Sequence, residues 1–540
     1  MQGYLINANA VRGGTGSLRT GPVAVRAGRF DRATPGDRRP AVDLGAATVV
    51  PGLIDAHLHL SLGAESMLEI DLSACRDRSA FEAAIGAGHA ALPPGAWLVG
   101  RGWNEDAFPG RVPPDRAWLA AAGDRPAVAW RMDAHACVVN DAVLRKLDLS
   151  ADPPGGRIHR DARGNPDGLM QESAAWTLVQ PLVPPIEAAR RLRAVADATR
   201  FLASLGLTAV GSMEYRATLE EGLVPQRDRL AVRIRATLLD RDFHRRDEWR
   251  GHLAFAREFT NDDRLAIVGM KAFIDGTLGS RTARMLEAYA DDPGNRGLLV
   301  EIAERGELLA WIREVRAARL SPAMHAIGDE AARLALDVAD ASDRSSDGTG
   351  HPIVRIEHAQ TVHRDDLARF AGRIASMQPL HKAYDARTAP DRLGPHRMDR
   401  FFRFRSLRDQ GATLAFGSDW PIVSPCPIRS MHAAITGLDV DGKPCRTDEN
   451  LTPAEALEAH ARGAARCLDA ADLGDLEPGF RADFTVLDRD PIRCDWSRER
   501  PRVLATAVGG RFTFVSPDAP FAPEIEATLS ASMRPPEPTR

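Results

Sequence analysis

The sequence predicts an α/β fold: a (β/α)8 TIM barrel with a small β-sandwich domain built from both chain ends and an insertion after barrel strand 1. From residue 187 onward, apolar strands alternate with amphipathic helices, which is the rhythm of such a barrel. A chain of 540 residues also exceeds one simple core, and it fits a barrel of about 250 to 400 residues with attachments. A doubly wound open sheet is the alternative, but the sequence lacks the G-x-G-x-x-G turn of dinucleotide sites.

Both chain ends carry short strands beside Gly-rich turns, and neither set can bury itself alone. Near the C-terminus, Gly509 and Gly510 are expected to form a hairpin turn. We therefore expect residues 1–53 and 473–540 to meet in one composite β-sandwich domain. The strands are expected at residues 4–11, 22–30, 41–50, 482–490 and 503–514.

Residues 54–472 are expected to form the barrel, with one insertion at about 64–185. The insertion is rich in Gly, Pro and Trp, and long insertions in compact domains are usually functional. We interpret it as the wall or lid of a site, with a purely structural elaboration as the alternative. Barrel strands are expected at 49–60, 205–214, 230–239, 264–276, 321–329, 352–360, 373–380 and 412–420; helices are expected at 188–204 and near 243–258, 302–319, 329–341, 398–410 and 453–468.

Composition restricts the partners and the compartment. The net charge of −4 leaves no basic field for nucleic acid or an anionic membrane surface, so the substrate is expected to be a small molecule. Six scattered cysteines form no C-x-x-C pair, which suits a reducing compartment. The sequence has neither a signal-peptide pattern nor 18 consecutive apolar residues. We expect a cytoplasmic protein, and a homodimer is compatible with these features.

The stretch VVPGLIDAHLHL, residues 49–60, predicts a strand with two histidines on one face. Side chains alternate along a strand, so His57 and His59 point the same way as Asp55. Neutral imidazole is the commonest protein ligand for zinc-like metals, and two imidazoles at i and i+2 can share one ion. Because the pattern is short, two solvated histidines at a strand edge are the alternative.

Other chemically active residues also stand at predicted strand ends. The catalytic groups of a (β/α)8 barrel lie at the C-terminal ends of its strands, so these side chains are expected to converge with His57 and His59. Taken singly, each could be an ordinary core or capping residue, but agreement among five strand ends favours a site. The candidates are Lys271, His325, His358 and Asp419.

Lys271 is one of only four lysines among 70 basic residues, and it lies within the apolar strand AIVGMKAFIDG. Strand rise places Asp275 about 13 Å further along, too far for an ion pair. A buried, unpaired ammonium costs several kcal/mol and lowers the pKa of the amine. A neutral amine can react with CO2, and the resulting carbamate is an oxygen ligand that can bridge two metals. A lysine that extends to the barrel rim is the alternative.

The phrases PGLIDAHLH, MKAFIDGTLGSRTA, MHAIGD, RIEHAQ and FGSDWP resemble the amidohydrolase superfamily. They are most similar to its YtcJ-like branch, amidohydrolase family 3, which includes N-substituted formamide deformylase. The resemblance implies two divalent ions, zinc above others. It implies His57 and His59 on the more buried ion, carbamylated Lys271 between the ions, His325 and His358 on the other ion, and Asp419 beside a bridging water.

We therefore expect a metal-dependent hydrolase that cleaves an amide or formamide-like, non-peptide carbon–nitrogen bond through a metal-activated hydroxide. Asp419 would take the proton from the nucleophile and pass it to the leaving nitrogen. A metal-dependent lyase or isomerase and a non-enzymatic scaffold are the alternatives, although a scaffold predicts lost ligands and all six positions are filled. Candidate substrate-binding residues are Arg281, Trp103, His135, Glu172, Gln378 and His381.

Overall fold

The computed structural model describes residues 4–11, 18–20, 23–34, 41–132, 136–153, 156–172, 174–239, 246–259, 262–344, 352–523 and 525. The chain divides into two compact units. The first contains Met1–Leu60 and Thr199–Arg540, and the second contains Ser61–Ala198.

The first unit contains the predicted barrel, a sheet of eight parallel strands in the order β19-β18-β17-β16-β15-β14-β13-β6. Most of the side chains in these strands are buried, as expected for parallel strands covered on both faces. The fold class is therefore confirmed. The strands are β6 (Leu53–Leu58), β13 (Leu207–Glu214), β14 (Arg233–Leu239), β15 (Leu265–Phe273), β16 (Ser321–Ala326), β17 (Arg355–His358), β18 (Ile374–Met377) and β19 (Thr413–Phe416).

The sheet is nearly closed, because the chain after β19 meets the end of β6. The backbone N–H groups of Ser418 and Asp419 donate to the carbonyl of His57 at 3.1 and 2.6 Å, and the N–H of His59 donates to Trp420 at 2.8 Å. Only glycine allows this approach at position 417, since a Cβ atom there would lie 2.6 Å from the backbone nitrogen of His57. The closing contacts therefore involve His57 and His59, two of the candidate metal ligands.

Several strands end earlier than the sequence predicts. β17 ends at His358 rather than near residue 360, because His358 and Ala359 have φ angles of 71° and 41° that turn the chain out of the strand. The expected strand at 412–420 ends at Phe416, shortly before Asp419, whose φ is 60°. These turns place the last residues of each segment at the mouth of the barrel rather than in its wall.

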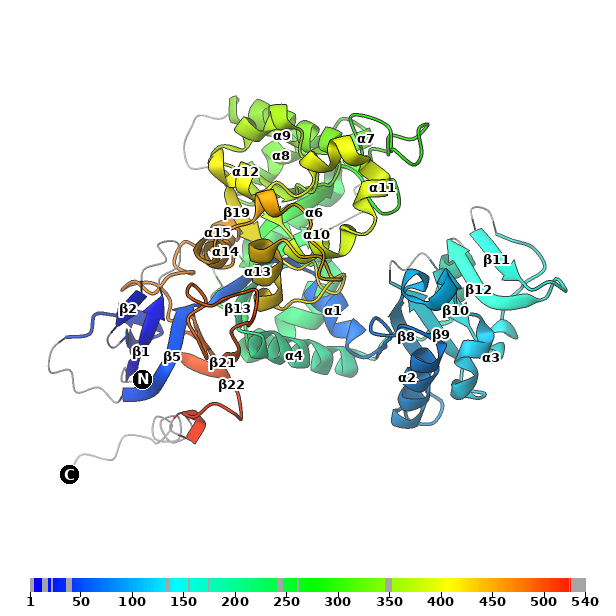
Figure 1. Ribbon diagram of the computed structural model, residues 1–540, viewed down its shortest axis with the longest axis horizontal. Coiled ribbons are helices and arrows are strands. Elements are labelled where there is room, and N and C mark those ends of the chain that lie inside the picture. The colour runs from blue at the N-terminus through cyan, green and yellow to red at the C-terminus, as the bar shows by residue number, and fades with distance from the viewer. Residues whose placement is uncertain are drawn as a thin grey trace. The chain divides into compact units, whose positions relative to one another are not determined.

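Helices cover the barrel strands (Figure 1). The expected helix at 302–319 is divided into two, because Gly306, with φ of 69°, separates α7 from α8. The expected helix at 453–468 is likewise divided at Ala461, whose φ and ψ of −124° and −95° are not helical. The helices of this unit are α4 (Ala188–Ser204, which begins in the second unit), α5 (Arg216–Thr218), α6 (Arg246–Ala256), α7 (Glu301–Glu304), α8 (Leu308–Ala317), α9 (Asp329–Arg344), α10 (Pro379–Asp385), α11 (Ala389–Leu393), α12 (Phe404–Asp409), α13 (Pro427–Thr436), α14 (Pro453–Ala459) and α15 (Arg462–Cys467).

Strands from both chain ends form a second sheet of eight strands (Figure 1). Its order is β22-β21-β20-β5-β1-β3-β4, with β2 paired to β1, and its buried side chains form one hydrophobic core. Gly509 and Gly510 form the hairpin turn with φ of 59° and 73°. The domain boundaries stay a prediction. The strands are β1 (Tyr4–Val11), β2 (Leu18–Thr20), β3 (Val23–Arg26), β4 (Arg29–Asp31), β5 (Ala41–Pro51), β20 (Phe484–Leu487), β21 (Val503–Val508) and β22 (Arg511–Val515).

The second unit contains its own six-stranded mixed sheet, in the order β11-β12-β10-β9-β8-β7. Its core includes the aromatic side chains of Phe81, Trp103 and Trp118, so the Gly- and Trp-rich insertion packs around apolar residues of its own. The elements are α1 (Leu60–Ser66), β7 (Ile70–Asp71), α2 (Arg78–Ala91), β8 (Leu98–Trp103), β9 (Ala127–Arg131), β10 (Ala136–Val139), α3 (Asp141–Leu144), β11 (Gly156–Arg160) and β12 (Pro166–Glu172).

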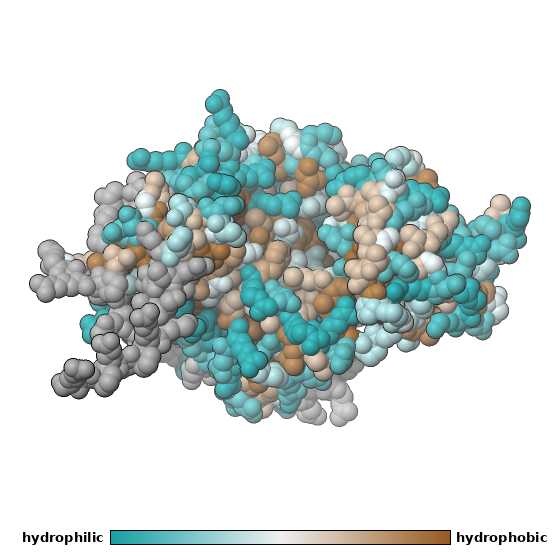
Figure 2. Space-filling view, turned by 90° about the horizontal axis from the view of Figure 1, so that it is seen from below, coloured by the Kyte–Doolittle hydropathy of each residue, from teal (hydrophilic) through white to brown (hydrophobic). Residues whose placement is uncertain are grey.

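The surface mixes polar and apolar side chains. Figure 2 shows hydrophilic residues, in teal, over much of one face, with hydrophobic residues, in brown, between them. In the described part of the chain, no helix combines the length and the apolar character needed to cross a membrane.

A buried ion pair connects the barrel to the sheet of the chain ends. The guanidinium of Arg233, in β14, binds both carboxylate oxygens of Asp483 at 2.7 and 3.0 Å, and both side chains are only 2% exposed. Arg233 also binds Asp263 at 2.6 Å, and Asp483 accepts the N–H of Gly509 at 2.6 Å. Removing one member of a buried pair leaves the other charge uncompensated.

We expect Asp483→Ala to lower the free energy of unfolding by about 3 to 5 kcal/mol, because Arg233 would stay buried without its main partner. Urea denaturation followed by circular dichroism measures this. The control is Glu220→Ala, which removes a half-exposed pair with Arg216 and should cost less than about 1 kcal/mol. Equal losses in the free energy of unfolding would show that the buried pair stabilises the protein no more than an exposed pair does.

Candidate metal centre

The barrel mouth gathers all six side chains that the sequence predicts as ligands. The Nζ atom of Lys271 lies 3.1 Å from Nε2 of His57, and Nε2 of His59 lies 3.1 Å from Oδ1 of Asp419. The ring centroids of His325 and His358 are 4.5 Å apart, and those of His57 and His358 are 5.0 Å apart. His57 lies in β6 and His59 directly follows it; β15 carries the lysine, β16 and β17 carry the other two histidines, and the turn after β19 carries the aspartate.

Two groups of these atoms are spaced to hold a metal ion. The ligand atoms of His57, His59 and Asp419 lie within 4.8 Å of one another, and so do those of His358, His381 and Asp419. Asp419 therefore belongs to both groups. His381, on α10, was expected to bind substrate; its placement among the candidate ligands was not foreseen.

The rings of three buried histidines are oriented by hydrogen bonds on one nitrogen. Nδ1 of His57 contacts Oε2 of Glu357 at 2.7 Å, and Nδ1 of His358 contacts Oε1 of Gln378 at 2.9 Å. Nε2 of His325 contacts the carbonyl of Gly276 at 3.0 Å. Each acceptor requires an N–H, so the other ring nitrogen carries the lone pair that a metal needs.

The remaining nitrogen of His325 is the clearest sign that a metal fits here. Its Nδ1 atom is buried and has no hydrogen-bond partner among the described residues. A buried polar atom without a partner costs about 1 to 3 kcal/mol, so native proteins rarely keep one without a function. The His325 nitrogen and the oriented rings of His57 and His358 match the nitrogen-rich donor set that zinc-like ions prefer.

The electrostatics also suit metal binding. Burial, reinforced by Lys271, lowers the pKa of His57 to about 4 and that of His325 to about 3. Burial also holds the pKa of His358 well below its usual value. Burial would raise the pKa of Asp419, but the nearby histidines, His57 first, outweigh it and hold the pKa well below its usual range. Neutral imidazoles therefore surround an ionised carboxylate at neutral pH.

Lys271 is 1% exposed, and its amine lies beside Nε2 of His57 and 4.8 Å from the ring centroid of Phe273. Asp275 serves another purpose. Its carboxylate accepts the backbone N–H groups of Ile327 and Gly328 at 3.0 and 2.7 Å, which joins the ends of β15 and β16. Burial raises the pKa of Asp275 to about 7.

The candidate substrate residues fall in several places. Gln378 and His381 lie at the centre, where Gln378 holds His358. Arg281 follows β15 and binds both oxygens of Asp291 at 3.1 and 2.8 Å. The other three belong to the second unit: Trp103 lies in its core with the indole N–H donating to Ala129 at 2.8 Å, Glu172 ends β12, and His135 lies outside the described residues. A substrate-binding role for each of the six stays a prediction.

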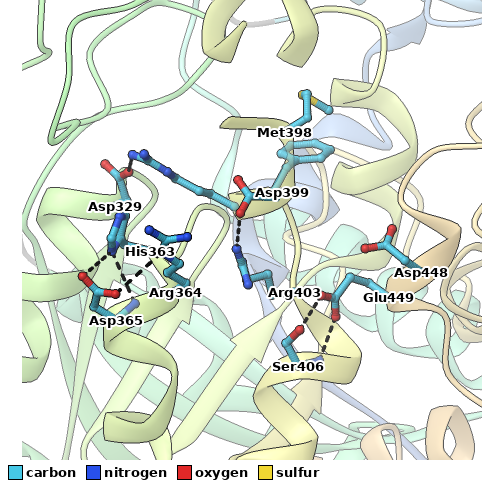
Figure 3. Close-up of polar contacts among 12 residues, drawn as sticks. Asp329, His363, Arg364, Asp365, Met398, Asp399, Arg403, Ser406, Asp448 and Glu449 are labelled. Carbon is cyan, nitrogen blue, oxygen red and sulfur yellow. Dashed lines mark hydrogen bonds and ion pairs between the residues drawn. The ribbon is translucent and has the colours of Figure 1, made fainter. Parts of the chain in front are cut away.

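Buried polar contacts hold α10 and therefore His381. Nζ of Lys382, a side chain only 2% exposed, donates to the carbonyl of Arg446 at 3.3 Å. The guanidinium of Arg446 in turn donates to the carbonyls of Met398 and Phe401 at 2.7 and 2.8 Å. Figure 3 shows neighbouring contacts of this region, in which Arg403 binds Asp399 and Ser406 binds Glu449.

Glu357 is the functional residue that sequence reasoning missed. It was visible in the phrase RIEHAQ as a carboxylate inside a buried strand, next to a candidate ligand. An unpaired carboxylate is costly in such a place, and that was the available signal. Burial raises the pKa of Glu357, but Arg355 and His57 outweigh it and lower the pKa to about 2.

Comparisons with known proteins agree with this geometry. A family model described as an amidohydrolase family matches residues 41–514. The chain is 30% identical over 488 residues to the putative amidohydrolase YtcJ of Bacillus subtilis, covering 84% of this chain and 86% of that protein. It is 28% identical over 500 residues to N-substituted formamide deformylase of Arthrobacter pascens, covering 87% of this chain and 89% of that enzyme. These matches confirm the resemblance inferred from the motifs.

A solved structure shares the fold over nearly the whole chain. The crystal structure of an uncharacterized metal-dependent hydrolase from Pyrococcus horikoshii superposes with a TM-score of 0.74 at 28% sequence identity. The alignment covers 92% of this chain and 100% of that chain.

We expect Zn²⁺ to stabilise the chelator-treated protein, because binding to the folded state alone adds about 4 kcal/mol at a concentration of 1,000 times Kd. Thermal unfolding measures the gain. His325→Ala should reduce it, since the variant lacks the unpartnered nitrogen, whereas His396→Ala, at an exposed position, should keep it. An equal gain in parent and His325→Ala would exclude His325 as a ligand.

Proposed function

Because the chain belongs to the amidohydrolase family and is a metal-dependent hydrolase of carbon–nitrogen bonds, we propose that its substrate is a small, non-peptide amide. The observation that carries this proposal is the cluster of neutral imidazoles around ionised Asp419 at the barrel mouth. The similarity to an enzyme named N-substituted formamide deformylase makes N-substituted formamides the first substrates to test.

We propose that the centre holds two divalent ions, zinc above others. His57, His59 and Asp419 would hold one ion, and His325 and His358 would hold the other, with a CO2-derived carbamate on Lys271 between them. The spacing of the first group and the free nitrogen of His325 support this assignment. When bound, such ions polarise a substrate carbonyl and lower the pKa of a water molecule to about 7.

Asp419 is the proposed general base and acid. Its low pKa keeps it ionised at neutral pH, so it can accept a proton from the attacking water. The Nε2 atoms of His59 and His57 lie 3.1 and 3.5 Å from its Oδ1 atom. An amine leaves readily only when protonated, so the same carboxylate returns the proton to the nitrogen as the carbon–nitrogen bond breaks. Water thereby converts the amide into a carboxylate and an amine.

We also propose a cytoplasmic location and a small-molecule partner. All six cysteines are free thiols, which supports a reducing compartment. The net charge of −4 argues against nucleic acid as the partner.

We expect the zinc-loaded protein to release formate and an amine from at least one N-substituted formamide, measured by chromatography of both products. Asp419→Asn should reduce turnover by at least about 10² to 10⁴-fold, the usual contribution of a positioned general acid–base. His396→Ala, at an exposed position, should keep full turnover. Undiminished activity of Asp419→Asn would contradict the role of Asp419.

We expect metal uptake to depend on CO2, because the carbamate forms on Lys271 from the neutral amine. Metal-free protein should bind less Zn²⁺ in CO2-free buffer than in bicarbonate, as read by a chromophoric zinc indicator. Lys271→Met should lose this dependence. Lys443→Met, which removes an exposed lysine, should keep it. Identical uptake by the parent in both buffers would refute the carbamate.

A further inference from the structure

We propose that Glu357, anchored by Arg355, is a positioning residue that fixes His57 for metal binding and makes it the strongest imidazole donor of the centre. This inference rests on the proposed metal centre and assigns a role to two residues that are not themselves ligands. It concerns the affinity and the order of metal binding rather than the chemical step.

Arg355, Glu357 and His57 form a continuous buried chain of contacts. Arg355 and Glu357 are two residues apart in β17, so both point to the same face of the strand. Their side chains are 0% exposed, and Nε of Arg355 lies 3.1 Å from Oε1 of Glu357 in an ion pair. The other carboxylate oxygen, Oε2, lies 2.7 Å from Nδ1 of His57. The carboxylate of Glu357 therefore contacts both the guanidinium of Arg355 and the ring of His57.

Neighbouring elements hold the arginine in place. Its Nη2 atom donates to Oγ1 of Thr237, in β14, at 2.9 Å, and its Nη1 atom donates to the carbonyl of Cys467, at the end of α15, at 3.2 Å. A guanidinium held by two hydrogen bonds and one ion pair has little freedom to rotate. Arg355 therefore holds the carboxylate of Glu357 in place, and this carboxylate is an acceptor at a fixed position for the N–H of His57.

The carboxylate sets His57 apart from the other buried histidines. His358 donates to the neutral amide oxygen of Gln378, and His325 contacts the backbone carbonyl of Gly276. A carboxylate acceptor makes the opposite imidazole nitrogen more basic, and therefore a stronger ligand, than a neutral acceptor does. Nε2 of His57 faces Asp419, at 3.5 Å, so the first ion is expected to bind in the group that contains these two residues.

The free-energy cost of burying the Arg355–Glu357 ion pair indicates that the pair serves function rather than stability. Replacing a buried ion pair by apolar residues of similar volume is often neutral or stabilising. The apolar side chain of Ile374 is buried in β18, in register with Arg355, so a charged pair is not needed to fill this face of the sheet. The pair is explained if its purpose is to supply a carboxylate to His57 deep inside the protein.

The test measures Zn²⁺ affinity by competition with a chromophoric chelator, using the full-length protein. Glu357→Gln keeps the shape and an acceptor oxygen but removes the charge. We expect it to weaken the tighter binding event about 10- to 100-fold, the usual effect of losing such a partner. The double variant Arg355→Met/Glu357→Gln removes the unpaired guanidinium, so it should recover the thermal stability of the metal-free protein but not the metal affinity.

A matched buried ion pair provides the control. Asp483→Asn disturbs the pair with Arg233, which is equally buried but belongs to the other end of the barrel, and it should lower stability without changing Zn²⁺ affinity. Glu357→Gln with parental affinity, or a double variant with restored affinity, would overturn the proposal. A parent protein that binds no Zn²⁺ would instead refute the proposed function.

Discussion

Closure of the barrel between β19 and β6 is the constraint on which the metal centre depends. The N–H groups of Ser418 and Asp419 donate to the carbonyl of His57, so the bonds that close the sheet also place two candidate ligands. Oδ1 of Asp55 accepts the N–H groups of His57 and Ser418 at 3.0 and 3.1 Å, so it also connects β6 to the chain after β19. The spacing of the candidate ligands is therefore a consequence of strand register, and loss of the contacts between these two segments would separate the ligands.

The barrel mouth buries polar and charged side chains, which costs free energy unless they are paired. Contacts among these side chains offset part of that cost. Burial keeps the imidazoles of His57, His325 and His358 neutral, and one nitrogen of each contacts a protein acceptor, so the other nitrogen carries the lone pair. The buried carboxylate of Glu357 is paired with the guanidinium of Arg355. Asp419 remains ionised because histidines surround it. Burial therefore prepares the ligands by lowering the histidine pKa values, whereas the nearby histidines outweigh the effect of burial on the pKa of Asp419.

The sequence predicted the barrel and the convergence of ligands well, because both depend on local patterns. Apolar runs mark the strands, and catalytic side chains of this fold lie at the strand ends. Contacts between strands could not be predicted in the same way. The contact of Gln378 with His358 and that of Glu357 with His57 were not predicted, because such contacts depend on register and ring orientation. The periodicity of apolar residues alone also did not predict the helix breaks at Gly306 and Ala461.

The central claim is that one barrel mouth holds metal ions between residues of five strand ends. Anomalous X-ray diffraction at the zinc absorption edge, on crystals grown from zinc-loaded protein, tests it most directly. We expect anomalous density about 2.0 to 2.2 Å from the ring nitrogens of His57, His59, His325 and His358 and from the carboxylate of Asp419. Density confined to other positions, or none at the mouth of a fully loaded protein, would contradict it.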